Sequence, residues 1–381
     1  MFKPRIILIF LASVVFITNL PAQPEITVFQ ALSYHSNAFY NYKQLADFTN
    51  YTGIGLKHYF NGEKIQSRIF YNGDLNAFKT YSERFYHQHH FGYDGLAANA
   101  ANTQTLYFGL SYSRNDFQAN YNFYDSWKVE GYLNSRIEFL PNLIGRFGYT
   151  LTHKKYVDLP EFSYQEHDFY LQGNTFFQSG TSIALLINYG LKNYIPLPIS
   201  PGRRGRNVAQ YSDLPGVDQL VTSIKIAQSL GTKTALSLKY LNRTNPGLVA
   251  GAAAVATEGE LFTENELFDD RYGYQGHEFN LTFTHYLPFY IKMETNASLQ
   301  LKNYLNRQIY NSDGDLTLTN ADRSDKRRIF WGRLSGGVGA TWGLKNLELY
   351  LDAGYIQNAS NDPYYQFDNI FGSLGMNLRV R

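Results

Sequence analysis

The chain has no cysteine, so neither disulfide bonds nor a lipid-modified N-terminal cysteine contribute to its structure. Tryptophan is scarce, with 3 residues against 32 tyrosines and 28 phenylalanines. Beyond the N-terminal stretch, no apolar run reaches the roughly 18 residues that a membrane-spanning helix needs. These absences exclude a disulfide-rich domain and a bundle of membrane helices.

An excess of charge of one sign is also lacking. The sequence has 34 Lys and Arg against 32 Asp and Glu, a formal net charge of +2. Neither a basic nucleic-acid footprint nor an acidic tail is present. We therefore expect no nucleic-acid partner.

The N-terminus has the layout of a secretory signal peptide. Met-Phe-Lys-Pro-Arg precedes an apolar stretch from Ile6 to Leu20, and Pro21-Ala22-Gln23-Pro24 follows it. A retained membrane anchor is the alternative, although the stretch is shorter than the roughly 20 residues of a spanning helix. We expect residues 1–22 to direct Sec export and to be cleaved near Ala22 and Gln23, and residues 23–381 to form a single domain.

What the chain does contain is long alternation of apolar and polar residues, clearest between Tyr290 and Lys302. One parity of this segment is Ile291, Met293, Thr295, Ala297, Leu299 and Leu301, and the other is polar. Successive side chains of a strand point to opposite faces, so one face meets an apolar medium and the other meets water. A tilted strand of roughly 11 residues, rising about 3.3 Å per residue, crosses a hydrocarbon layer.

The same alternation recurs along the chain as a series of hairpins. We predict short turns at 61–63, 114–116, 141–142, 178–180, 231–232, 287–288 and 343–345, with longer polar segments between most of them. Phe117, Ala119, Tyr121 and Phe123 are interpreted as one face of a strand. The pattern predicts about 16 strands, with 14 as the alternative. Between Lys79 and Asn102, a long loop and an extra strand pair fit equally well.

A soluble β-sandwich also alternates, but its water-facing side usually carries many Lys and Glu. Here that side is rich in Asn, Gln, Ser, Thr, Gly and Tyr, and charged residues make up only 17% of the chain. The abundant Tyr and Phe are typical of the aromatic girdles of membrane barrels. We therefore predict an all-β fold, a transmembrane antiparallel up-and-down β-barrel with short periplasmic turns and long extracellular loops.

With its leader, its hairpin rhythm and the alternating segment from Gly372 to Arg381, the chain resembles bacterial outer-membrane β-barrels of the porin-like kind. The resemblance implies a bacterial outer-membrane location, contact with outer-membrane lipid and passage of small hydrophilic solutes. Such proteins often end in an aromatic residue that the assembly machinery reads. This chain instead ends Leu378-Arg379-Val380-Arg381, which indicates a divergent lineage.

Function is expected to depend on the polar parity, which should face the barrel interior. A barrel of about 16 strands can leave an aqueous channel. Mixed charges fit a water-filled lumen with a modest anion preference, and they also fit a lumen closed by internal salt bridges. The residues expected to line the lumen are Lys128, Glu130, Arg136, Glu138, Arg146, Lys192, Lys225, Lys292, Glu294, Lys302, Arg333, Glu348, Asp352 and Arg379, with Asp168, Lys239 and Glu278 on the same parity.

Three functions are compatible with this pattern. The first is a channel, not an enzyme, for passive diffusion of small hydrophilic solutes. The second is a non-transporting scaffold or assembly partner, with a homo-oligomer or another envelope protein as its partner. The third is a barrel lipid hydrolase, because His35-Ser36-Asn37 resembles the catalytic strand of such enzymes; however, His35 and Ser36 are adjacent and should point to opposite faces, whereas Ser33 shares the face of His35.

No metal site or cofactor is predicted. His87 and His89 would share a strand face as potential metal ligands, with His90 next to them, but no third ligand is evident. The acidic segment from Glu258 to Asp270 and the run from Asn311 to Asp315 lack a full calcium-ligand series.

Two further segments have unusual composition. The basic cluster from Pro201 to Arg206 fits contact with anionic lipid head groups or an anionic solute, and it fits plain solubility equally well. The small apolar segment from Gly247 to Ala256 is expected to fold against the barrel mouth or into the lumen.

Overall fold

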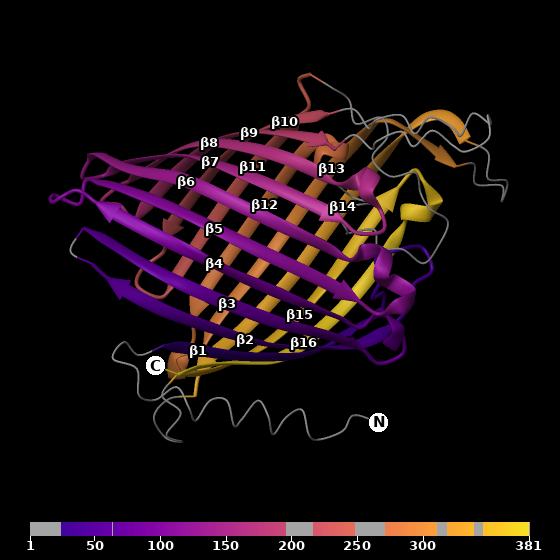
Figure 1. Ribbon diagram of the computed structural model, residues 1–381, viewed down its shortest axis with the longest axis horizontal. Coiled ribbons are helices and arrows are strands. Elements are labelled where there is room, and N and C mark those ends of the chain that lie inside the picture. Colours follow the sequence, from indigo (N-terminus) through magenta and orange to yellow (C-terminus); the bar gives the residue numbers. More distant parts are fainter. Residues whose placement is uncertain are drawn as a thin grey trace, which may run out of the picture.

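The chain folds into a closed antiparallel β-barrel (Figure 1). The computed structural model describes residues 24–62, 64–195, 216–247, 271–310, 318–338 and 346–380. Each of the 16 strands pairs with its neighbours in sequence, and β1 (Glu25–His35) pairs with β16 (Phe367–Val380) to close the sheet. The predicted up-and-down barrel and the predicted strand number are confirmed.

Most strands are far longer than those of soluble sheets, as crossing a membrane at a tilt requires. The strands between β1 and β16 are β2 (Asp47–Asn61), β3 (Ile65–Phe78), β4 (Tyr86–Ala98), β5 (Gln104–Phe117), β6 (Ser126–Leu140), β7 (Leu143–Tyr156), β8 (Tyr164–Phe176), β9 (Thr181–Tyr194), β10 (Val217–Ser229), β11 (Thr234–Thr244), β12 (Gln275–Tyr286), β13 (Lys292–Tyr310), β14 (Leu318–Gly337) and β15 (Leu347–Ser360).

No helix among the described residues is long and apolar enough to cross a membrane.

The apolar parity forms the outer surface of the barrel. Residues paired across neighbouring strands share a face, and Leu281, Ala297 and Phe330 form one such row over β12, β13 and β14. At the closing seam, Leu32 pairs with Leu374. These two leucines are 55% and 60% exposed, as expected of side chains whose surroundings are lipid rather than a protein core.

The two ends of the barrel differ in the length of their connections. At one end the turns are short, as between β6 and β7 or β8 and β9. The other end carries the longer connections, which include the 3-10 turns η1 (Ser82–Arg84), η2 (Ala119–Tyr124), η3 (Pro160–Phe162), η4 (Arg271–Gly273) and η7 (Pro363–Tyr365). The register of β1 with β16 pairs Ile26 with Val380, so both terminal strands begin or end at the short-turn end.

The predicted turn at 114–116 is wrong. These residues lie inside β5, which continues to Phe117 opposite Tyr86. The predicted strand over 117–123 is also wrong, because residues 119–124 form η2. The Asp125 carboxylate accepts a hydrogen bond from the Phe117 N–H at 2.7 Å, and Tyr124 packs in a buried aromatic cluster, so local capping and aromatic packing overrode the alternation.

For the segment from Lys79 to Asn102, the sequence fits a long loop and an extra strand pair equally well. The segment contains strand structure. It holds η1 and all of β4, and a short connection then leads to β5. The segment therefore contains one strand, so neither the long loop nor the extra strand pair is correct. From β1 to β13, long and short connections alternate, whereas the connection between β14 and β15 is not shorter than its neighbours. The turn predicted at 343–345, within that connection, lies outside the described residues.

Candidate functional site: the barrel interior

The polar parity faces the barrel interior, where charged residues form ladders along single strands. Lys128 lies 3.0 Å from Glu130, and Lys292 lies 2.6 Å from Glu294. Each pair is two residues apart on one strand, so both side chains project from the same face. Arg136 pairs with Glu138 in the same way, at 3.2 Å.

Other interior charges pair between strands. The Arg333 guanidinium meets the Asp352 carboxylate through two hydrogen bonds of 2.6 and 2.7 Å, from β14 to β15. Both residues lie on the face opposite the exposed Leu334 and Leu351. This bidentate geometry fixes both side chains against the wall.

Glu25 joins three strands at the seam. Its carboxylate lies 3.0 Å from the Lys57 ammonium on β2 and 3.7 Å from the Arg379 guanidinium on β16. Its side chain is 4% exposed. Burying a charge costs free energy unless the charge is paired, so the two cations stabilise this buried carboxylate. Arg379 therefore belongs to the closure of the barrel as well as to its interior.

Three further cations on the inner face have no acidic partner among the described residues. Among the described residues, no ion pair includes Arg146, Lys225 or Lys239. Lys225 and Lys239 are paired directly across β10 and β11, and Arg146 is paired with Arg136 across β6 and β7. Like charges placed opposite each other are unfavourable, so Lys225 and Lys239 keep an uncompensated positive field on the β10–β11 wall.

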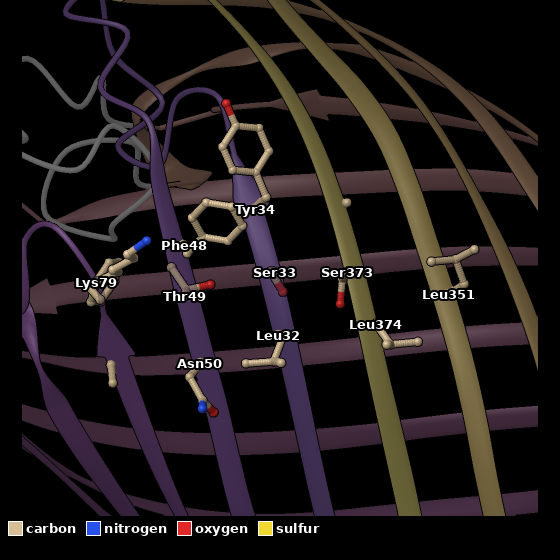
Figure 2. Close-up of a pocket in the computed structure, with 13 residues that line it drawn as sticks. Leu32, Ser33, Tyr34, Phe48, Thr49, Asn50, Lys79, Leu351, Ser373 and Leu374 are labelled. Atoms are coloured by element: carbon tan, nitrogen blue, oxygen red, sulfur yellow. The ribbon is translucent and has the colours of Figure 1, made fainter. Parts of the chain in front are cut away.

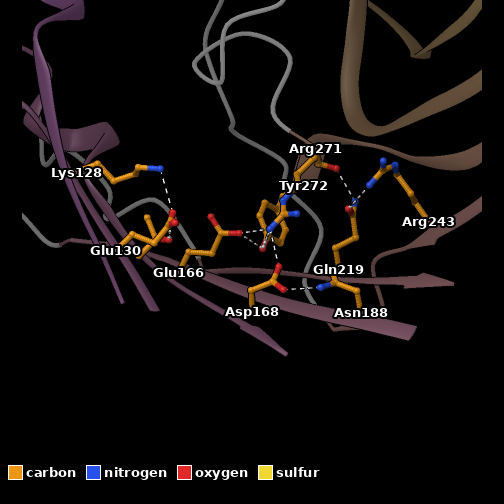
Figure 3. Close-up of polar contacts among 10 residues, drawn as sticks. Lys128, Glu130, Glu166, Asp168, Asn188, Gln219, Arg243, Arg271 and Tyr272 are labelled. Atoms are coloured by element: carbon orange, nitrogen blue, oxygen red, sulfur yellow. Dashed lines mark hydrogen bonds and ion pairs between the residues drawn. The ribbon is translucent and has the colours of Figure 1, made fainter. Parts of the chain in front are cut away.

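At the long-loop end, η4 folds inward onto the wall formed by β8, β9 and β10 (Figure 3). The Arg271 guanidinium contacts Glu166 and lies 2.9 Å from Asp168, both on β8. The Tyr272 hydroxyl donates to Glu166 at 2.8 Å, and the Gln219 amide donates to the backbone oxygen of Arg271. These contacts hold η4 against this wall at the long-loop end.

Lys192 and Lys302 are enclosed by aromatic rings rather than open to the lumen. Lys192 Nζ lies 4.1 Å from the ring centroid of Tyr164 and 5.1 Å from that of Tyr194. Lys302 Nζ lies 4.6 Å from the ring centroid of Tyr274. Both lysines are 4% exposed, so they fix the mouth segments through cation–π contacts.

A second cationic cluster at the mouth was not anticipated from the sequence. The Arg323 guanidinium lies 4.1 Å from the Tyr304 ring and 3.4 Å from the Tyr365 ring, and it bonds to Asp325. Asn358 donates to the backbone oxygen of Tyr365 at 2.7 Å and so anchors η7. The only local signal was the charge run 321–328, which is typical of a solvated loop and does not predict a buried cluster.

η1 is held by the same type of contact. The Arg84 guanidinium lies 4.0 Å from the Phe39 ring and 4.6 Å from the Phe78 ring. Burial lowers the pKa of Arg84, and the two ring faces offset part of the cost of burying this cation. Segments are therefore anchored at several places around the rim of the barrel.

The sequence matches no known protein family and no curated protein. The structure is similar to Pseudomonas aeruginosa OccD3 (OpdP), with a TM-score of 0.53 and 9% identity over 96% of this chain and 93% of that one. It is also similar to Acinetobacter baumannii OccAB1, with a TM-score of 0.51 and 9% identity over 94% and 96% of the two chains. For Pseudomonas aeruginosa OccK8 (OprE) the TM-score is 0.50, with 9% identity over 94% and 98%.

The protein has the fold of a porin-like barrel. At such low identity the likeness is one of fold. In this porin-like barrel the apolar parity covers the outside and the polar parity lines the interior.

His87 and His89 lie on the outer face of the porin-like barrel, not in its lumen. The two imidazoles are 3.1 Å apart, and the Tyr71 hydroxyl lies 2.8 Å from His89 Nδ1. Arg114 pairs with Asp116 beside them, whereas His90 faces inward. In the described part of the chain, no group of three or more His, Asp or Glu side chains could hold a metal.

The residues considered for hydrolysis form a structural contact. His35 stacks on Phe371 at 5.9 Å, and the Ser36 hydroxyl accepts a hydrogen bond from the Ile370 N–H at 2.8 Å. Within the described ranges, no hydrogen bond joins His35 to Ser33 or to Ser36. The arrangement ties β1 to β16 at the rim.

Four segments singled out in the sequence lie wholly or almost wholly outside the described residues. They are the basic cluster at 201–206, the apolar segment at 247–256, the acidic segment at 258–270 and the run at 311–315. Of these only Gly247 is described, and its N–H donates to Asp218 at 3.0 Å. The leader, residues 1–22, also lies outside the described ranges.

Proposed function

We propose that this protein is a passive channel for small hydrophilic solutes. The observation that carries the proposal is a closed barrel of 16 strands with charged and polar side chains on its inner face. Barrels of about this size can enclose a water-filled channel, whereas barrels of about eight strands are filled by side chains. The channel needs no bond chemistry, which agrees with a non-enzymatic protein.

Selection would combine size with charge. The segments fixed by Arg271, Arg323 and Arg84 narrow the mouth and set the size limit. Below the mouth, Lys225 and Lys239 give one wall a positive field that favours small anions modestly. The other predicted lining residues are largely neutralised by their ion-pair partners.

Recording in planar bilayers tests the channel directly. Purified protein should insert and raise conductance in discrete steps, and liposomes containing it should swell in small sugars and stop swelling as sugar size increases. Protein that inserts as a folded barrel and never raises conductance would rule out the channel.

A non-transporting scaffold is the second candidate, favoured by the dense network that fixes η4 and η7 in the mouth. If the lumen is plugged, the loops and the outer face are the surfaces that bind a partner, either a second copy or another envelope protein. Crosslinking in intact membranes followed by purification distinguishes the candidates. A stoichiometric partner combined with zero conductance supports the scaffold.

We also propose that the mature protein is one domain comprising residues 23–381, released from a signal peptide of residues 1–22. The apolar stretch from Ile6 to Leu20 supports this. Intact-mass measurement on protein from outer membranes tests it, because a retained leader adds the mass of 22 residues.

A further inference from the structure

An apolar groove runs over the seam where β1 meets β16, on the outer face of the barrel (Figure 2). It has a volume of about 600 Å³. Its walls include Leu32, Phe48, Leu351 and Leu374 from four strands, and these side chains point away from the interior. The groove therefore opens into the lipid and not into the lumen.

The shape of the groove follows from small residues between large ones. Gly372 and Ala77 contribute almost no side chain, whereas Leu32, Phe48 and Leu374 beside them are 53–60% exposed. A chain of methylene groups lying between such ridges contacts protein along its length. The groove thus matches a single extended acyl chain.

A cation stands beside the groove at its long-loop end. Lys79 Nζ lies 5.3 Å from the centroid of the Phe48 ring, and the Lys79 N–H donates to the Phe48 carbonyl at 2.9 Å. Tyr34 packs against Phe48 with ring centroids 5.0 Å apart. Among the described residues, no carboxylate forms an ion pair with Lys79. Tyr and Lys at a strand end mark the level of the lipid head groups.

A second groove on the outer face lacks the cation that lies beside the seam groove. It covers β12 to β15, has a volume of about 520 Å³, and is flanked by Phe283, Phe330 and Tyr355 around Gly332. No Lys or Arg is among its lining residues. The seam groove alone of these two offers both an apolar channel and a positive charge.

We propose that the seam groove binds one anionic phosphoglycerolipid, with an acyl chain between Leu32 and Leu374 and its phosphate at Lys79. One ammonium group matches one phosphate, and the narrow channel holds one of the two acyl chains of such a lipid, whereas the larger lipopolysaccharide, with more acyl chains, does not match them. The bound lipid would hold together the first and last strands, whose pairing closes the barrel. This proposal does not depend on solute transport.

Native mass spectrometry of detergent-purified protein with added palmitoyl-oleoyl phosphatidylglycerol tests the proposal. The wild-type protein should retain one lipid in preference to further ones. Lys79→Gln should weaken retention about fivefold, since one Lys contributes about that factor beside an anionic lipid. Gly372→Leu should fill the groove and abolish the single retained lipid. It should still fold, because a Cβ at this position meets only the Asp352 carbonyl, at 3.8 Å.

Matched variants outside the groove provide the controls. Gly173→Leu places the same side chain on the outer face of β8, where nothing lies within 4 Å, and Lys155→Gln removes an exposed cation from the outer face of β7. Both should retain the lipid like the wild type. Equal losses in the control and groove variants would overturn the proposal. So would Lys79-dependent retention of lipopolysaccharide with no Lys79-dependent retention of phosphatidylglycerol.

Discussion

The Tyr149 hydroxyl lies 2.7 Å from His167 Nδ1 on the outer face, where β7 and β8 approach the long-loop end. His167 is two residues before Phe169, the residue paired with Tyr149 across the strands. The same diagonal contact recurs between Tyr71 and His89 at 2.8 Å. It also recurs between Tyr240 and His277 at 2.9 Å, and between Tyr355 and Asp368 at 2.8 Å. These pairs form a belt of capped tyrosines near the level of the lipid head groups.

Removing a phenolic hydroxyl from this belt should destabilise the barrel. Tyr149→Phe leaves the ring in place and removes the hydrogen bond to His167. The free energy of unfolding should fall by about 0.5–1.5 kcal/mol. Urea titration in lipid vesicles measures this. Tyr34 lies on the same face, and its hydroxyl forms no hydrogen bond among the described residues, so Tyr34→Phe should change the free energy of unfolding much less.

The lysine pair on the β10–β11 wall should set the charge preference of the channel. Changing Lys225 and Lys239 together to Gln removes two uncompensated charges from the lumen. A unit charge about 4 Å away in water contributes about 1 kcal/mol, so the ratio of anion to cation permeability should fall, by up to about fivefold per charge. The reversal potential in a KCl gradient measures it. Lys233→Gln, in the adjoining short turn, is the control, and an equal shift there would contradict the assignment.

The Arg271 contacts should keep the mouth narrow. Arg271→Gln removes the cation between Glu166 and Asp168, which then repel each other and release η4 from the wall. Single-channel conductance and the largest sugar admitted by liposomes should both rise. Arg146→Gln removes an interior cation that anchors no segment, so the size limit should stay unchanged in that variant. A larger limit in both variants would mean that charge, and not the position of η4, governs entry.

Asp362 should make the mouth more stable in mild acid. Burial raises the pKa of this carboxyl, which accepts a hydrogen bond from the Tyr364 N–H at 3.0 Å and caps η7. A raised pKa in the folded state favours the protonated form. The protonated Asp362 carboxyl therefore adds to the free energy of unfolding below its ordinary pKa of 3.8. This stabilisation is lost as the pH rises through the higher pKa of the folded state.

Asp362→Asn keeps the cap and removes the charge. At pH 7 the variant should unfold at the same or a higher urea concentration than the wild type, and the difference should shrink toward pH 4. Urea titration at both values measures it. A variant that is clearly less stable at pH 7 would show that Arg323 and Arg307 outweigh the effect of burial.

The sequence was sufficient to predict the barrel because its main determinant is local. Alternation such as that of Leu299 and Leu301 against Gln300 and Lys302 depends on neighbouring residues and fixes which side meets lipid. The same rule failed at 117–123, where alternating aromatic and polar residues form η2. Periodicity alone does not reveal that Tyr124 packs in one buried cluster with Tyr156.

The mouth could not be predicted because its contacts join distant parts of the chain. Arg271 and Glu166 are 105 residues apart in sequence, and Arg307 and Tyr365 are 58 apart. Parity placed Lys192 and Lys302 on the inner face, yet it carries no information about the aromatic rings that enclose them. Depth along the lumen, not the choice of face, separates a buried anchor from an accessible charge.

The three-strand contact of Glu25 makes closure of the barrel a cooperative step. Glu25 lies on the first strand and Arg379 on the last, so this contact forms only after every intervening strand has taken its place. Until then, β1 and β16 each present an unpaired edge, and the Glu25 carboxylate lacks its contact with Arg379. A chain stalled short of β16 is therefore an open sheet that can pair with foreign strands, and the ion pair at the seam is absent until the sheet closes.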